Sequence, residues 1–385
     1  MAEGHRTLQV DGNRLTLLPE GPQRLAALIE LIDGAKTSLR LLYYIYRGDR
    51  SGTAVRDALV RAVDRGVKVS LLIDGFGSAW TPESYFKDLR DRGGILCRFN
   101  PSFGRSYLLR NHQKLALADA ETAEARILIG GFNVEDSYFA TLSDNGWRDI
   151  GLLVEGPSAA RVAPYYDSLM DWALSPRSRL KTLRRVVRKF SETEGALQWQ
   201  YGGPMQLKSP WAISTVRDLA AAHDLEMIVA YFAPLSGMLK RIANVATRGR
   251  ARVIAAGKSD NPATIDAARS TYGRLLRRGV QVFEYQASRL HSKLLVMDDV
   301  VHIGSSNFDL RSLYLNLEMM LRVQDPDFAL MMRSYFEHEL GSSKEITPEM
   351  HERAGWLQRL RWRIGWFLVT SIDYTVTRRL ALRVP

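Results

Sequence analysis

Two stretches of the chain place a histidine and a lysine at the same spacing. Residues 112–119 read HQKLALAD and residues 291–298 read HSKLLVMD, so both fit the pattern His-x-Lys-x-x-x-x-Asp. Equivalent positions in the two stretches lie 179 residues apart. A single copy would most often belong to an ordinary strand. Two copies at one offset indicate a duplicated functional element.

These side chains suit chemistry at phosphorus. A histidine can attack a phosphoryl group or protonate its leaving oxygen, and a lysine can stabilise the negative charge that develops. The candidates for these roles are His112, Lys114, His291 and Lys293. Residues i and i+2 of a strand point to the same face, so each His–Lys pair is expected to project together.

A second short pattern follows each stretch. The segments RILIGGFN and VVHIGSSN read as return strands that end at Asn133 and Asn307. Gly131 and Ser305, two positions earlier, are small and leave room for a substrate to approach. Each asparagine offers a neutral amide donor. Each half of the chain therefore supplies one imidazole, one ammonium group and one carboxamide.

The aspartates that end the two stretches belong to the same candidate set. Asp119 and Asp298 lie seven positions after their histidines, which is an odd offset. In a regular strand they would face away from the histidine. We therefore expect them to have a structural role rather than a direct part in the chemistry.

Two facing halves would form a single site. They would place two histidines around one phosphorus, so that one could attack while the other protonates the departing oxygen. A zinc site requires three or four histidine, cysteine or carboxylate ligands, and a lysine ammonium group would repel the ion. We expect neither a metal nor another cofactor.

The surrounding elements repeat as well. Residues 38–49 read as a strand, and residues 53–74 read as a helix, a basic-Gly turn and another strand. Residues 225–234 and 236–257 repeat that order in the second half. Alternating strands and helices predict an α/β fold with largely parallel sheets, built from two duplicated domains.

The predicted boundaries divide the chain into three parts. The first domain covers 1–190 and ends in a helical linker with seven cations in RSRLKTLRRVVRK. The second domain covers 200–345. Residues 346–385 form a basic, Trp-rich C-terminal segment.

With both motifs in place, the chain resembles the phospholipase D superfamily, whose signature is HxKxxxxD followed by G[GS]xN, twice per active site. The flanking segments WRDIGLLVEG, YFAP and GSSNFDLRSLYLNLEM look most like bacterial cardiolipin synthases of the short type, which lack N-terminal transmembrane helices. The resemblance implies two phospholipase D-like α/β domains, each a mixed sheet flanked by helices, packed about a pseudo-twofold axis.

The resemblance also implies a mechanism. One histidine attacks the phosphodiester to form a phosphohistidine, the other protonates the leaving alcohol, and a second alcohol resolves the intermediate. We favour His112 as nucleophile and His291 as acid. Acidic residues beyond each asparagine orient the imidazoles in this family, and here the matching residues are Asp149 and Glu318. The implied substrate is phosphatidylglycerol, and the acceptor is a second phospholipid headgroup.

The net charge of the chain favours some classes of binding partner over others. The chain has 53 Lys and Arg against 42 Asp and Glu, giving a net charge of +11. Such an excess favours polyanions, either an anionic membrane surface or nucleic acid. No aromatic-basic stacking platform is evident outside the C-terminal segment, so nucleic acid is the weaker expectation. The one cysteine, Cys97, excludes an intramolecular disulfide.

The N-terminus has no long apolar region, and no run approaches the roughly 20 apolar residues that span a bilayer. We therefore expect a peripheral protein on the cytoplasmic face of the bacterial inner membrane. Tryptophan and arginine interleave in the C-terminal segment, which suits an interfacial helix, although packing against the domain is the alternative. The residues expected to bind membrane are Trp356, Arg359, Arg361, Trp362, Arg363 and Trp366.

Three functions are compatible with this sequence. The first is a phosphatidyltransferase of the cardiolipin synthase type. The second is a phospholipase D or a nuclease that uses the same two histidines for hydrolysis. The third is a non-catalytic membrane- or nucleic-acid-binding protein, against which the intact motifs in both halves argue.

Overall fold

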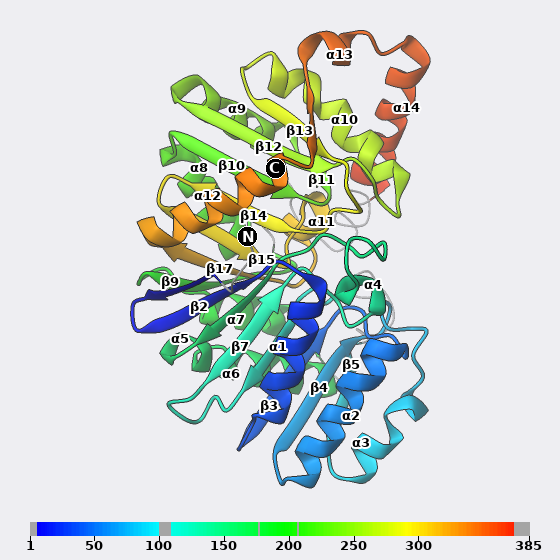
Figure 1. Cartoon of the computed structure of the whole chain (residues 1–385), viewed down its shortest axis with the longest axis vertical. Helices are drawn as coiled ribbons and strands as arrows, with labels where there is room; N and C mark the ends of the chain where they lie inside the picture. The colour runs from blue at the N-terminus through cyan, green and yellow to red at the C-terminus, as the bar shows by residue number, and fades with distance from the viewer. Residues whose placement is uncertain (1–5, 100–108, 176–177, 206–207, 373–385) are drawn as a thin grey trace.

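A computed structural model describes residues 6–99, 109–175, 178–205 and 208–372 of the chain. Within these residues the chain forms two eight-stranded mixed sheets flanked by helices, and one small two-stranded sheet (Figure 1). This confirms the predicted α/β fold.

The first sheet is formed by the N-terminal half. Its strands lie in the order β1 (Arg6–Val10), β2 (Asn13–Leu18), β8 (Gly151–Glu155), β7 (Arg126–Gly130), β6 (Leu115–Ala118), β3 (Ser38–Tyr43), β4 (Lys68–Asp74) and β5 (Ile95–Phe99). Its helices are α1 (Gly21–Asp33), α2 (Arg50–Asp64), α3 (Lys87–Asp91), α4 (Asp136–Phe139), α5 (Pro157–Ala160), α6 (Ala163–Leu174) and α7 (Leu180–Phe190), with a 3₁₀ turn at Glu83–Phe86.

The second sheet is formed by the C-terminal half. Its order is β18 (Ser343–Ile346), β13 (Gln281–Tyr285), β12 (Arg250–Ala256), β10 (Asp224–Val229), β14 (Lys293–Met297), β15 (Val300–Gly304), β17 (Glu318–Gln324) and β9 (Leu197–Gly202). The short pair is β11 (Phe232–Ala233) with β16 (Phe308–Asp309). The helices are α8 (Pro210–Ala221), α9 (Ser236–Arg248), α10 (Pro262–Leu276), α11 (Leu310–Tyr314), α12 (Pro326–Leu340), α13 (Pro348–Glu352) and α14 (Trp356–Phe367), followed by a π-helical turn at Leu368–Ile372.

The two sheets share one topology. Strands β3, β4 and β5 pair in parallel, as do β10, β12 and β13. The hairpins β6–β7 and β14–β15 then add antiparallel strands in the same relative place. The duplication is therefore confirmed, but the sheets are mixed rather than largely parallel, because each motif lies on a hairpin and a short hairpin can only join antiparallel strands.

Helix α2 shows how the sequence forms the repeated strand–helix unit. Asp49 caps its N-terminus by accepting a hydrogen bond from the Gly52 amide. Val55, Leu59 and Ala62 are spaced by four and three residues, so they lie on one face and are buried. They pack in the core that covers the outer face of the first sheet.

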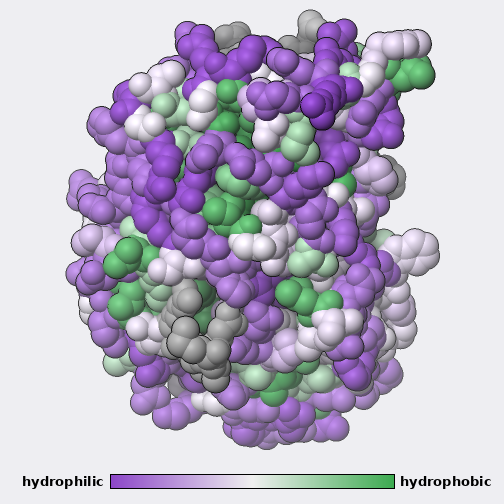
Figure 2. Space-filling view, turned by 45° about the horizontal axis from the view of Figure 1, so that its top comes forward, coloured by the Kyte–Doolittle hydropathy of each residue, from purple (hydrophilic) through white to green (hydrophobic). Residues whose placement is uncertain are grey.

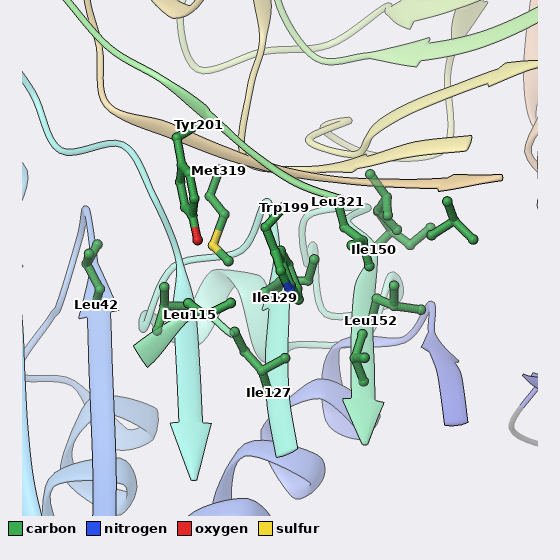
Figure 3. Packing of buried hydrophobic residues seen from close by; sticks show 14 of the residues in the cluster. Leu42, Leu115, Ile127, Ile129, Ile150, Leu152, Trp199, Tyr201, Met319 and Leu321 are labelled. Carbon is green, nitrogen blue, oxygen red and sulfur yellow. The ribbon is translucent and has the colours of Figure 1, made fainter. Parts of the chain in front are cut away.

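A single hydrophobic core joins the two halves. Figure 3 shows Leu115, Ile129 and Leu152 of the first sheet directed towards Trp199 and Leu321 of the second. All of these side chains are buried in the same cluster. Because the inner faces of the sheets share this core, the interface between the halves is a packed layer that can hold side chains from both in fixed positions.

The surface outside this core is mainly polar. Figure 2 shows one face of the molecule as mostly hydrophilic, with hydrophobic residues in small separate areas. Helix α7 carries five cations, none of which forms an ion pair with an acidic residue in the described part of the chain: Lys181, Arg184, Arg185, Arg188 and Lys189.

Candidate active site

The two motifs meet across the interface through their backbones. The amide of His112 donates to the carbonyl of Leu317 at 2.9 Å, and the amide of His291 donates to the carbonyl of Arg148 at 2.7 Å. Leu317 and Arg148 come directly before the acidic residues Glu318 and Asp149. The contacts are reciprocal, as an approximate twofold relation between the halves requires.

Each histidine bonds to the acidic residue of the other half. The Nδ1 atom of His112 lies 3.0 Å from the carboxylate of Glu318, and the Nδ1 atom of His291 lies 2.7 Å from that of Asp149. All four side chains are buried. With both Nδ1 atoms engaged, the two Nε2 atoms are the ring nitrogens left to meet a substrate.

The lysines bond to the backbone of their own histidines, a contact that the strand pattern did not predict. Strand β6 begins at Leu115 and β14 begins at Lys293, so both histidines precede the regular strand. The Nζ atom of each lysine, Lys114 and Lys293, instead donates back to the carbonyl oxygen of its own histidine. The regular strand therefore does not extend to the histidines, but the side chains of His291 and Lys293 do lie together, with Nζ of Lys293 2.7 Å from Nδ1 of His291.

The small and amide residues differ between the halves. The Oγ atom of Ser305 donates to the carboxylate of Glu318 at 2.5 Å. At Gly131 there is no room for a side chain, because a Cβ atom would lie 2.6 Å from a carboxylate oxygen of Asp149. The Oδ1 atom of Asn133 accepts from the Ile45 amide at 3.1 Å.

The amide of Asn307 is buried beside the second motif. Its Oδ1 atom has no hydrogen-bond partner among the described residues. A buried polar atom of this kind is costly unless a ligand or water satisfies it. Asn307 is therefore positioned as a group that a polar substrate can engage.

The two histidine–carboxylate pairs differ in their electrostatics. Burial raises the pKa of Glu318 to about 7, although Lys114 opposes this shift. Burial alone would also raise the pKa of Asp149, but the His291 ring and Lys293 hold it below its usual value. Burial and then the nearest lysine lower the pKa of both histidines, that of His291 to about 3. At neutral pH Asp149 is thus ionised, while Glu318 is close to its midpoint.

Burial also affects the lysines. It lowers the pKa of Lys293 to about 8 and that of Lys114 well below its usual value. A bound phosphate would favour the charged form of both groups, because an opposite charge stabilises an ammonium ion.

Aromatic rings form the walls around the histidines, and no sequence motif identified them directly. The ring of Tyr44 lies 5.0 Å from His112, and the rings of Tyr138 and Trp147 lie 5.1 and 5.4 Å from His291. Tyr231 lies 6.3 Å from His291. Tyr44 and Tyr231 both follow the first parallel strand of their half, so the repeat itself was the signal that could have identified them.

The motif aspartates have the contacts of structural residues. Asp119, with a φ of 54°, accepts from the backbone amides of Lys36, Thr37 and Ser38. Asp298, with a φ of 48°, accepts from the amides of His223 and Asp224. In both halves the carboxylate therefore ties the motif hairpin to the start of the first parallel strand.

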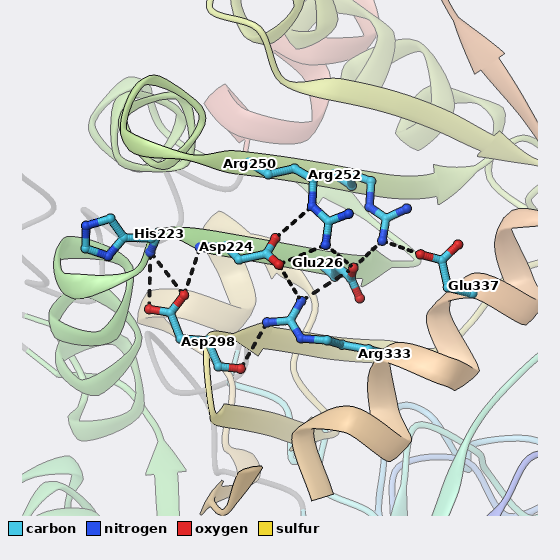
Figure 4. Close-up of polar contacts among 8 residues, drawn as sticks. All are labelled: His223, Asp224, Glu226, Arg250, Arg252, Asp298, Arg333 and Glu337. Atoms are coloured by element: carbon cyan, nitrogen blue, oxygen red, sulfur yellow. Dashed lines mark hydrogen bonds and ion pairs between the residues drawn. The ribbon is translucent and has the colours of Figure 1, made fainter. Parts of the chain in front are cut away.

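Figure 4 shows this arrangement in the second half. Asp298 holds the start of β10 beside an ion-pair network in which Arg333 contacts Asp224 and Glu226. The contacts support the structural role expected for both motif aspartates.

The C-terminal residues do not all face solvent. Trp362 is only 6% exposed, and its ring stacks on His351 with the centroids 5.0 Å apart. Arg361 forms an ion pair with Asp266 of α10 at 3.1 Å. The expectation that Trp362 lies on a membrane-facing surface is wrong in this structure, because that side of α14 packs on α10.

The opposite side of α14 is exposed and apolar. Its exposed side chains are Trp356, Leu357, Leu360, Ile364 and Phe367. Trp356 is 72% exposed and Phe367 is 59% exposed. Arg363 is also exposed, and Trp366 is half-buried. We call the five exposed apolar residues the α14 stripe.

Two features of the described residues concern metal binding and the membrane. In those residues no group of three or more His, Cys, Asp or Glu side chains is arranged to hold a metal ion. In the same part of the chain, no helix has the length and hydropathy required to span a bilayer.

Comparison with known proteins agrees with this geometry. The family model described as "Cardiolipin synthase, PLD-like domain" matches residues 28–168 and 217–340, one segment in each half. The major cardiolipin synthase of Bacillus subtilis is 30% identical over 367 residues, covering 91% of this chain and 73% of the relative. Cardiolipin synthase A of Pseudomonas aeruginosa is 30% identical over 376 residues, covering 94% of this chain and 74% of the relative.

A solved structure shares the fold. The phosphatidylserine synthase of Haemophilus influenzae superposes with a TM-score of 0.70 at 14% sequence identity, covering 99% of this chain and 97% of that one. Together with the family match in both halves, the shared topology confirms the predicted duplication. The chain therefore belongs to the phospholipase D superfamily, as a phospholipid-modifying phosphatidyltransferase of its cardiolipin synthase family.

Proposed function

We propose that this enzyme transfers a phosphatidyl group from phosphatidylglycerol to a hydroxyl group of a second phospholipid headgroup, through a phosphohistidine. The observation that carries the proposal is the pair of bonds from His112 to Glu318 and from His291 to Asp149, which place two oriented imidazoles at one interface. The cardiolipin synthases among the relatives support phosphatidylglycerol as the substrate.

In the first step, Nε2 of His112 attacks the phosphorus of phosphatidylglycerol. A P–N bond forms while the P–O bond to the glycerol headgroup breaks. His291, whose protonated form is favoured by the bound phosphate and by ionised Asp149, gives its proton to that oxygen. Glycerol leaves. Lys114 and Lys293 stabilise the negative charge on the non-bridging oxygens.

In the second step, a hydroxyl group of another phospholipid enters in place of glycerol. Neutral His291 removes its proton, the oxygen attacks phosphorus, and the P–N bond to His112 breaks. His291 is then protonated again and His112 is free. With phosphatidylglycerol as acceptor, the product is cardiolipin.

The unequal carboxylates support this assignment of roles. An ionised carboxylate stabilises an imidazolium, and Asp149 is ionised beside His291. Glu318, with a pKa of about 7, is only partly ionised at neutral pH and therefore stabilises the protonated form of His112 less strongly. The histidine that must carry a proton is therefore the one beside the stronger anion, and His112 remains as the nucleophile. Asn133 and Asn307 are proposed to contact the phosphoryl oxygens, while Gly131 leaves the space that the Asp149 carboxylate occupies.

Product analysis tests the reaction. Purified protein is incubated with phosphatidylglycerol vesicles, and the lipids are identified by mass spectrometry. Cardiolipin with released glycerol supports the transferase, whereas phosphatidic acid would identify a hydrolase. His112→Ala and His291→Ala should each abolish turnover, and EDTA should leave it unchanged. No turnover by the wild-type protein, or its loss with EDTA, would contradict the proposal.

We also propose that the α14 stripe docks the enzyme on the membrane that contains its substrate. Five apolar side chains face solvent on one helix, and Arg363 of the same helix is exposed. Apolar side chains beside cations suit the interface of an anionic bilayer. The role proposed for Trp362 and Arg361 is instead to hold α14 on α10.

Vesicle co-sedimentation tests the docking. Leu360→Glu with Ile364→Glu should reduce binding to vesicles containing phosphatidylglycerol by roughly tenfold or more, because both groups would enter the interface. Ile213→Glu is the matched control, since Ile213 is equally exposed on α8. Equal binding of the double variant and the control would contradict docking through α14.

A further inference from the structure

A cavity lies beneath α14, on the body of the second half. It has a volume of about 320 Å³ and opens between α9, α10 and α14. Its apolar walls come from Pro234, Leu235, Leu239 and Trp366. This volume lies at the lower end of the range of small-molecule sites, which combine apolar walls with a few polar groups.

The charged groups of the cavity have one sign. Arg274 of α10 and Arg363 of α14 line it, and no acidic residue does. Neither arginine forms an ion pair with an acidic side chain in the described part of the chain. Two guanidinium groups above apolar walls match a ligand that has an anionic group joined to a hydrocarbon chain.

The cavity adjoins the docking helix, and a short segment of chain connects it to a residue of the active-site wall. Trp366 and Arg363 lie on the same helix as the α14 stripe. Leu235 follows Tyr231 by four residues, and the Tyr231 ring packs 6.3 Å from His291. Four residues span at most about 14 Å, so the backbone of Leu235 lies within about 14 Å of that of Tyr231.

We propose that this cavity is a phospholipid-binding site outside the catalytic centre. Arg274 and Arg363 hold the phosphate, and Leu235, Leu239 and Trp366 contact the start of one acyl chain. The ligand is an anionic phospholipid taken from the docked bilayer. The choice of an anionic phospholipid as the ligand rests on the proposed function, but the site itself takes no part in the transfer of the phosphatidyl group.

Photo-cross-linking of the full chain tests the site. The probe is phosphatidylglycerol with a diazirine near the start of one acyl chain, diluted in phosphatidylcholine vesicles. The protein is the His112→Ala variant, so that the probe is not consumed. We expect cross-linked peptides to map to 234–239 and 363–366. Adding Arg274→Gln and Arg363→Gln should reduce this labelling at least fivefold relative to Arg278→Gln, which removes a charge from the turn after α10, outside the cavity.

Competition identifies the recognised group. Unlabelled phosphatidylglycerol should displace the probe, while diacylglycerol, which has no phosphate, should not. Equal labelling in the double variant and the control would overturn the site, and so would equal competition by the two lipids. Because the assay measures binding, its failure leaves the transfer reaction standing, and absence of turnover in the product assay leaves this result standing.

Discussion

Nδ1 of His112 lies 3.0 Å from the carboxylate of Glu318, although 206 residues separate them in the chain. The reciprocal bond, from His291 to Asp149, spans 142 residues. Each histidine therefore comes from one half and its orienting carboxylate from the other. The two halves form one site, and neither has a complete histidine–acid pair of its own.

The crossed pairs predict the effect of neutralising either acid. Glu318→Gln and Asp149→Asn keep the shape of the side chain but remove the charge that orients the ring and stabilises its protonated form. Each should lower kcat by roughly 100-fold or more, because general acid–base catalysis contributes that much. Steady-state kinetics with phosphatidylglycerol checks this. A neutral amide stabilises an imidazolium less than a carboxylate does, so Asp149→Asn should also shift the pH profile of kcat. Full activity of either variant would contradict the crossed arrangement.

The two small residues before the asparagines are predicted to respond differently. Gly131→Ser would force a Cβ atom against Asp149 and should displace the carboxylate, with loss of nearly all activity. Ser305→Gly removes one hydrogen bond to Glu318, so a loss of only about 1–2 kcal/mol of transition-state stabilisation is expected. Kinetics of the two variants at equal folded concentration compares them. Similar losses of activity in the two variants would show that the difference between Gly131 and Ser305 does not affect catalysis.

Glu318 also predicts a pH dependence of stability. Its pKa is raised on folding to about 7, so its contribution to stability is complete below pH 4.5 and is lost as the pH rises to about 7. The change amounts to about 3 kcal/mol. Glu318→Gln does not titrate, so its stability relative to wild type should increase between pH 5 and 7 and level off above pH 8. Denaturant unfolding at each pH measures it, and a constant difference would refute the shift.

The motif aspartates are predicted to affect stability more than catalysis. Asp119→Ala leaves the amides of Thr37 and Ser38 without their acceptor, which should cost about 1–3 kcal/mol of unfolding free energy. The kcat per folded molecule should change less than fivefold. Asp298→Ala should behave in the same way. Thermal unfolding and kinetics of the same samples decide between this role and a direct one, for which kcat would fall with Tm unchanged.

The fold could be predicted from the sequence, and candidate site residues could be selected, because the duplication provides internal evidence. His112, Lys114 and Asn133 have counterparts at nearly constant offsets, and such a repeat is readable without a structure. The crossing of His112 to Glu318 is not readable, because a sequence offset does not say which half a side chain contacts. The same limit applies to Tyr44 and the other rings around the site.

The C-terminal helix shows a second limit. Trp362 and Gly365 lie on one side of α14, and Leu360, Ile364 and Phe367 lie on another. Both sides are apolar enough to be buried, so periodicity alone cannot select between them. Gly365 determines which side of α14 packs on α10. A Cβ atom there would lie 2.8 Å from the Cβ of Asp266, so only a glycine permits this contact.

In the proposed reaction, one phosphorus passes through a covalent bond to His112 in a site completed by both halves. The direct measurement is a time course with phosphatidylglycerol, stopped with alkaline detergent to preserve phosphohistidine and followed by peptide mass spectrometry. A phosphatidyl adduct is expected on His112, forming before cardiolipin accumulates and absent from His112→Ala. An adduct on His291, or turnover with no adduct on either histidine, would contradict it.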